Sequence, residues 1–261
     1  MGAHMIGIRL AGKNNRIPAS VFIRSLNSFL DLINDVDSTL SQKPRGSVRW
    51  DLVSLQMSSP ASVEFAGVSH IQAMDYSQPI QDSVLDGIEQ LKERPEQPQF
   101  YSFSALTKVR RMAEQAKFLK WLTVFTDNRR TEITKQVSTN VEYIMTTGSR
   151  SLGSVRGSLD ALKVHAGHEF QIWSPKSRRP VTCQFEKPML PGVIAHLKQQ
   201  VEVFGQLHRN QRGEPILMRV EQFFPLESAK TVPSLHEVSG LIPNLYGDRS
   251  LKDYLEELRN G

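Results

Sequence analysis

The sequence has little cysteine and no long hydrophobic run, and both absences narrow what the protein can be. Cys183 is the only cysteine in 261 residues, so an internal disulfide is excluded and a reducing compartment is favoured. Its apolar neighbours in RPVTCQF indicate a buried small hydrophobic residue in preference to a nucleophile. No apolar run reaches about 18 residues, so we expect no membrane span and a cytoplasmic protein. Residues 1–4 look like a purification-tag remnant, with no signal peptide after them.

Patterns typical of catalysis and of metal binding are also missing. There is no glycine-rich phosphate loop and no internal repeat. His165 and His168 are three residues apart, but no third ligand follows at metal-site spacing. The string GSVRG lacks the strand–turn–helix setting of a nucleophile elbow, and no acidic cluster suggests a two-metal nuclease. We therefore expect a non-enzymatic protein with no cofactor and no metal site.

Composition and charge are those of an ordinary globular protein. Hydrophobic residues make up 39% and charged residues 23%, which at this length suggests one large domain or two modest ones. The formal net charge of +5 is mild. It permits an acidic partner without requiring nucleic acid.

Hydrophobic periodicity predicts an N-terminal α+β domain over residues 5–148. MIGIRL reads as a strand, residues 18–40 as a helix with one apolar stripe, and residues 48–68 as two strands turning at SSP. Two further helices, a hairpin turning at TDNR and a short helix follow. The fold class expected for the whole chain is α+β.

The pattern changes after Arg150. Residues 151–226 read in the order strand, strand, strand, helix, strand, strand, with the helix near residues 190–200. Gly153, Gly157 and Gly205 fall inside strand patterns, where glycine is typical of bulges and sharp bends. This order resembles the OB-fold, a five-stranded Greek-key barrel with a helix between its third and fourth strands, and it implies an OB-like β-barrel.

An OB-like barrel could bind single-stranded nucleic acid through aromatic and cationic side chains. Strand alternation places Phe170 and Ile172 in the core and points Trp173 outward. In the alternative interpretation the aromatic residues only fill the barrel and PKSRRP is a solvated turn. The candidate nucleic-acid-binding residues are Trp173, Lys176, Arg178, Arg179, Arg209 and Arg212.

Residues 227–261 read as an extended tail that ends in an amphipathic helix. Ser250 can cap this helix, and its apolar residues recur at i, i+3, i+4 and i+7 on one face. Such a short helix is not stable alone in water, so its apolar face must dock on the protein's own body or on another chain. The residues of that face are Leu251, Tyr254, Leu255 and Leu258.

The string DRSLKDYLEELRNG resembles the C-terminal tails of bacterial antitoxins that partner PIN-domain ribonucleases in toxin–antitoxin systems. The matching residues are Asp248, Arg249, Ser250, Tyr254, Leu255, Leu258 and Arg259. The resemblance implies that Arg259, or Arg249 in its place, pairs with the metal-binding carboxylates of a PIN-domain toxin. The apolar face, with Leu251, would anchor the helix in a groove beside that site.

The chain departs from this family in what precedes the tail. Such antitoxins are usually short and carry a small DNA-binding dimerisation domain, which an α+β domain and an OB-like barrel replace here. The resemblance therefore does not imply operator binding, and it leaves homo-oligomerisation open. The sequence predicts an antitoxin-like protein that inhibits a PIN-type ribonuclease, with single-stranded nucleic-acid binding by the barrel as the alternative.

Overall fold

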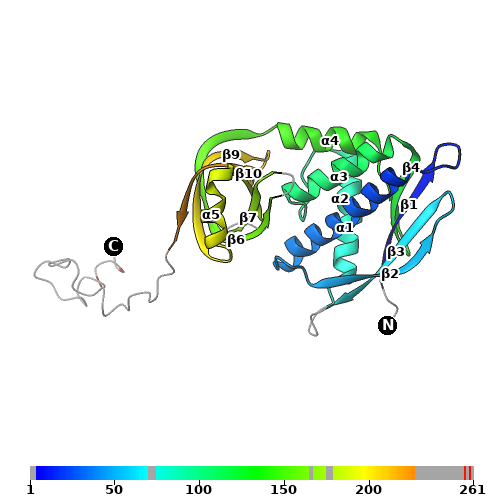
Figure 1. Ribbon diagram of the computed structural model, residues 1–261, viewed down its shortest axis with the longest axis horizontal. Coiled ribbons are helices and arrows are strands. Elements are labelled where there is room, and N and C mark those ends of the chain that lie inside the picture. The colour runs from blue at the N-terminus through cyan, green and yellow to red at the C-terminus, as the bar shows by residue number, and fades with distance from the viewer. Residues whose placement is uncertain are drawn as a thin grey trace, which may run out of the picture. The chain divides into compact units, whose positions relative to one another are not determined.

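The computed structural model describes residues 4–69, 75–164, 167–174 and 179–226, together with Glu256 and Arg259. The chain divides into two compact units, Met1–Leu226 and Glu227–Gly261. The described part of the first unit is a mixed α+β structure with five α-helices and two five-stranded sheets (Figure 1). None of its helices has the length and apolarity needed to cross a membrane. Except for Glu256 and Arg259, the predicted terminal helix lies outside the described residues.

The first sheet, called the open sheet here, is antiparallel throughout. Its strand order is β2-β3-β1-β4-β5. Ile8 of the central strand pairs with Val63 on one side and Val124 on the other, and all three side chains are buried. Alternation along these strands therefore sends one face into the core. The strands are β1 (Met5–Gly12), β2 (Val48–Gln56), β3 (Ala61–Ser69), β4 (Leu119–Thr126) and β5 (Arg130–Glu132).

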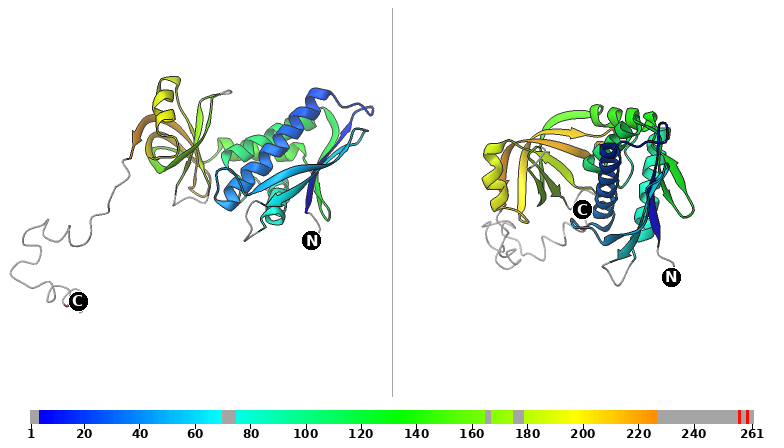
Figure 2. Two further views of the ribbon diagram at one scale, coloured as in Figure 1. Left: turned by 60° about the horizontal axis from the view of Figure 1, so that its bottom comes forward. Right: turned by 45° about the vertical axis from the view of Figure 1, so that its right-hand side comes forward.

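Helices cover the apolar face of the open sheet (Figures 1 and 2). The apolar stripe predicted for residues 18–40 is buried, with Phe29 and Ile33 fully enclosed. Each buried side chain of this size contributes about 1.5–3 kcal/mol relative to exposure. Ser102 caps the helix Phe103–Ala116 by accepting a hydrogen bond from the backbone N–H of Ala105. The helices are α1 (Ala19–Ser41), α2 (Ser77–Glu93), α3 (Phe103–Ala116) and α4 (Lys135–Thr146).

The second sheet, called the closed sheet here, pairs its strands in the closed order β10-β8-β7-β6-β9. The β8–β10 pair is parallel and the other pairs are antiparallel. A short helix, α5 (Leu190–Ala195), lies between β8 and β9 along the chain. It ends before residue 200, where the sequence pattern predicted its end, because Lys198 and Gln199 pair with Leu159 of β6 instead. The strands are β6 (Ser149–Lys163), β7 (Glu169–Trp173), β8 (Val181–Gln184), β9 (Gln200–Arg209) and β10 (Pro215–Pro225).

The closed sheet has its own apolar core. Phe170 is fully buried, and its ring centroid lies 5.3 Å from that of Phe185 and 6.3 Å from that of Phe223. Ile172 and Cys183 are also fully buried, as their sequence patterns predicted. Burial raises the pKa of the Cys183 thiol, which keeps it neutral and makes it a poor nucleophile.

Two of the predicted glycine positions are places where strands approach closely. A Cβ on Gly157 would lie 2.2 Å from the carbonyl oxygen of Trp173, and one on Gly205 would lie 2.1 Å from that of Arg219. Because both neighbours are backbone atoms, no side-chain rearrangement could relieve the clash. The closed sheet therefore requires glycine at both positions.

Candidate functional site

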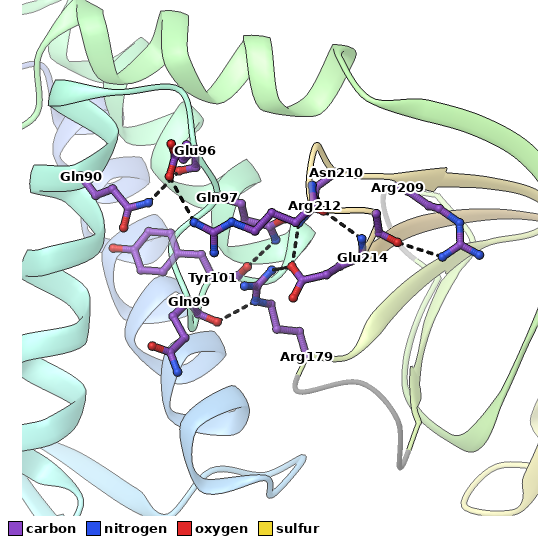
Figure 3. A network of polar contacts seen from close by, with 11 residues as sticks. Gln90, Glu96, Gln97, Gln99, Tyr101, Arg179, Arg209, Asn210, Arg212 and Glu214 are labelled. Carbon is purple, nitrogen blue, oxygen red and sulfur yellow. Dashed lines mark hydrogen bonds and ion pairs between the residues drawn. The ribbon is translucent and has the colours of Figure 1, made fainter.

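Polar contacts join the β9–β10 loop of the closed sheet to the segment between α2 and α3. Asn210 donates from Nδ2 to Gln97 Oε1 at 2.8 Å, and Arg212 donates from Nη2 to Glu96 Oε2 at 3.1 Å. Gln97 in turn donates to the carbonyl of Tyr101 at 2.7 Å. Figure 3 shows these side chains meeting between the β9–β10 loop and the segment that joins α2 to α3. We call this set of residues the junction network.

Arg179 is part of this network. Its Nε donates to the carbonyl of Gln99 at 2.6 Å and its Nη1 to Glu214 Oε2 at 3.0 Å. The residue is only 8% exposed, so its guanidinium is committed to contacts within the chain. Figure 3 shows the side chains of Arg179 and Arg212 both directed toward the segment that carries Glu96 to Tyr101.

The electrostatics of the junction network favour a charged Glu214 at neutral pH. Burial raises the pKa of Glu214, but the hydrogen bond from Asn210 and the charge of Arg179 outweigh burial, so its pKa lies below its ordinary value. The stabilisation that follows is present above the ordinary glutamate pKa of about 4.3 and is lost as pH falls through the lower folded-state value. Glu214 is therefore charged at neutral pH, where it accepts the hydrogen bonds of Arg179 and Asn210.

Tyr101 anchors the helical side of the network. Burial, followed by the charge of Asp86, raises its pKa well above the usual range, so the phenol stays neutral. Its hydroxyl donates to the carbonyl of Val84 at 2.7 Å, and its ring packs directly against Gly87. A Cβ on Gly87 would approach the ring to 2.4 Å, so α2 requires glycine there.

The described candidates for nucleic-acid binding divide between the network and the rest of the closed sheet. Arg179 and Arg212 belong to the network, while Arg209, the last residue of β9, donates to the carbonyl of Gly213 in the β9–β10 loop at 3.0 Å. Trp173 is half-buried, and its indole N–H is buried with no hydrogen-bond partner among the residues that the structure describes. Lys176 and Arg178 lie outside the described residues.

Of the partner-binding residues predicted in the tail, only Arg259 is among the described residues. Arg259 is helical and exposed. The others lie outside the described residues: Arg249, Leu251, Tyr254, Leu255 and Leu258.

Asn210 is the centre of the junction network, so its replacement by Ala should destabilise the protein. Its side chain also accepts the N–H groups of Arg212 and Glu214, each at 3.0 Å. Each buried group left without a partner costs about 1–3 kcal/mol. We expect Asn210→Ala to lower Tm by several degrees, at about 2–4 °C per kcal/mol for a unit of this size. Thermal unfolding followed by circular dichroism measures the change.

The matched control is Asn34→Ala, at an exposed position on α1. Removing a surface side chain there should change stability by less than about 0.5 kcal/mol. Equal Tm values for the two variants would show that the junction network does not stabilise the protein.

A second polar region, which sequence patterns did not reveal, lies beside the first turns of α3. A cleft of about 280 Å³ is lined there by residues of α1, α3 and the closed sheet. Lys108, Arg111 and Lys163 bring positive charge to it, and Asp31 and Glu169 bring negative charge. The capping signal at Ser102 could have located the start of α3, but nothing local places Lys163 beside it.

A wider hollow of about 910 Å³ lies on the other face of the open sheet and is lined by residues that include Trp121 and Phe125. Arg9 lies 4.6 Å from the ring centroid of Phe125, as a cation–π contact. Arg129 is bound to Asp86 and Glu89, and further carboxylates line the hollow. Positive and negative groups are close to balance, so this hollow does not favour a ligand of either charge.

The chain matches no protein family and no curated protein sequence.

Proposed function

We propose that this chain is a non-enzymatic, antitoxin-like protein that binds and inhibits a PIN-type ribonuclease through its C-terminal tail. The observation that carries the proposal is the tail pattern. Four apolar residues at helical spacing are combined with an arginine near each end, Arg249 and Arg259. A short helix of this kind needs a surface to dock on, and a partner's groove supplies one.

The division of the chain into two compact units supports this proposal, because it separates the tail from the rest of the protein. The boundary between its compact units falls between Leu226 and Glu227, ahead of the tail pattern. Glu256 and Arg259 are helical and exposed, so the Arg259 guanidinium is accessible to a partner. The tail can therefore be tested by truncation beyond the last strand of the closed sheet.

The proposed inhibition has a simple chemical basis. PIN-type ribonucleases hold divalent metal between carboxylates, and a guanidinium can pair with carboxylates through two parallel hydrogen bonds. Arg259 placed in such a site would compete with the metal or displace its ligands. Arginine suits this role better than lysine, because its planar group keeps its charge and its fixed geometry on burial.

We also propose that the closed sheet is an OB-like barrel. Its closed strand order, with the parallel β8–β10 pair and α5 between β8 and β9, supports the proposal. In that fold, ligands bind over the second and third strands, which correspond to β7 and β8 here.

Deleting residues 248–261 tests the antitoxin proposal. The full chain should co-elute with the ribonuclease encoded next to it and suppress its cleavage of a fluorescent RNA. The truncated chain should do neither, because it lacks both the apolar anchor and Arg259. Its Tm should match that of the full chain, which shows that the body still folds. A truncated chain that binds and inhibits as well as the full one would refute the proposal.

A further inference from the structure

The cleft beside α3 has positive groups that are not fully neutralised. Lys108 pairs with Asp31 at 3.1 Å, and Glu169 accepts a hydrogen bond from Gln184 at 2.9 Å. Within the described part of the chain, the hydrogen bond that Lys163 makes is to the hydroxyl of Ser104, at 3.3 Å. Arg111 is exposed and has no ion pair within the described ranges. Lys163 and Arg111, which both line the cleft, are thus available to an anion.

The carboxyl group of Asp35 lies next to this cleft and interacts with both Lys108 and Lys163. Burial raises its pKa, and Lys108, Ser104 and Lys163 oppose the shift. Its Oδ2 atom is buried and has no hydrogen-bond partner within the described ranges. Among the residues that line the cleft, three cationic side chains, Lys108, Arg111 and Lys163, stand against the two carboxylates of Asp31 and Glu169.

A buried hydroxyl faces the same cleft. Thr182 of β8 lines it and is only 4% exposed, and its Oγ1 has no hydrogen-bond partner within the described part of the chain. Buried polar groups in folded proteins are almost always paired, so an unpaired hydroxyl at a cleft wall can accept or donate a hydrogen bond to a bound group. A ligand oxygen in the cleft would provide that partner.

The start of α3 strengthens the preference for an anion. Phe103 and Ser104, in its first turn, line the cleft, and this 14-residue helix has no acidic residue in that turn. The partial positive charge at the helix N-terminus is therefore not offset by a carboxylate. Backbone N–H groups at such a terminus are suited to phosphate.

We propose that this cleft binds a phosphate group of a nucleotide or of single-stranded nucleic acid. Thr182 Oγ1 and the ammonium of Lys163 contact the phosphate oxygens, and Arg111 covers them from the solvent side. The volume of about 280 Å³ suits one phosphate with part of its sugar. This site is separate from the tail, so it adds to the proposed inhibition of a nuclease and does not depend on it.

The first test measures binding of a fluorescent oligothymidine of about ten nucleotides, within the usual site size for a single strand. Arg111→Ala and Lys163→Ala should each weaken binding by about tenfold or more, because a charged hydrogen bond is lost. Each should also reduce the slope of log affinity against log salt by about 0.7, as expected for one phosphate contact fewer. Arg24→Ala, an exposed cation on α1, is the matched control and should change neither quantity.

The substitution Thr182→Val distinguishes a loss of ligand affinity from a loss of protein stability. The change replaces the hydroxyl with a methyl group of similar size, and burial of that hydroxyl without a partner costs stability in the free protein. Tm should therefore stay the same or rise while affinity falls severalfold. A purely structural role for Thr182 predicts no loss of affinity.

Experiments with inorganic phosphate show whether the bound phosphate group belongs to a nucleotide or to single-stranded nucleic acid. Competition between phosphate and the oligothymidine indicates a nucleic-acid site, whereas a phosphate-dependent rise in Tm without oligothymidine binding indicates a small phosphate ligand. Whichever of these effects is observed should be weakened or lost in Lys163→Ala and retained after deletion of residues 248–261. If neither probe binds, or if Arg24→Ala weakens binding as much as Arg111→Ala, the proposal is wrong.

Discussion

Replacing Leu255 with Asp is expected to abolish binding of the proposed nuclease partner. Leu255 lies on the apolar face of the tail pattern, and its loss removes about 1.5–3 kcal/mol of buried contact. A carboxylate buried in its place adds a desolvation cost. Affinity should therefore fall at least about 100-fold, since each 1.4 kcal/mol is a factor of ten. Isothermal titration with the purified nuclease measures the change.

Arg259→Ala should have a different effect from Leu255→Asp, because it leaves the apolar anchor unchanged. Binding should persist, while the concentration needed for half-inhibition of RNA cleavage rises by about 10–100-fold for the loss of a charged, bidentate contact. Arg259→Lys should restore part of the inhibition, since lysine keeps the charge without the planar group. If inhibition is unchanged in Arg259→Ala, Arg249 is the next residue to replace.

Glu256→Ala is the matched control for these tail variants, since Glu256 is also helical and exposed. It should change neither binding nor inhibition by more than about twofold, in line with the small value of exposed charge pairs. A Leu255→Asp variant that binds like the wild-type chain would show that the apolar face is not the anchor.

The helices and strands could be predicted because their signals are local. The helix predicted over residues 18–40 is observed as Ala19–Ser41, and the two strands predicted to turn at SSP are observed as β2 and β3. In each case burial of one face imposes a repeat of 3.6 or of 2 residues on the sequence. Where pairing with a distant strand decided the structure, as for Lys198 and Gln199 against β6, the local pattern extended the helix too far.

The polar sites could not be predicted in this way, because their members are far apart in the sequence and follow no repeat. Asn210 and Gln97 are 113 positions apart, and Arg179 and Gln99 are 80 apart. Arg179 therefore looks like a free cation in a turn, although it is buried in the junction network. Thr182 looks like an ordinary strand residue, and only the fold places it opposite the start of α3.

The junction network has a consequence for how the first unit unfolds. Its side chains connect the β9–β10 loop to the segment before α3, and Gln97 and Asn210 are almost fully buried where they meet. Separating the closed sheet from the helices would expose these groups and leave several without partners. We therefore expect the open sheet, its helices and the closed sheet to unfold together in one transition.

Phe170→Ala tests this coupling and should have the largest effect on stability. Phe170 is fully buried between Phe185 and Phe223, and truncation of such a side chain costs about 3–5 kcal/mol. At about 2–4 °C per kcal/mol, Tm should fall by roughly 6–20 °C in a single transition. Phe224→Ala, at a half-exposed position on β10, should cost much less. If Phe170→Ala instead splits unfolding into two steps, with the helices melting at the wild-type temperature, the network does not couple the two sheets.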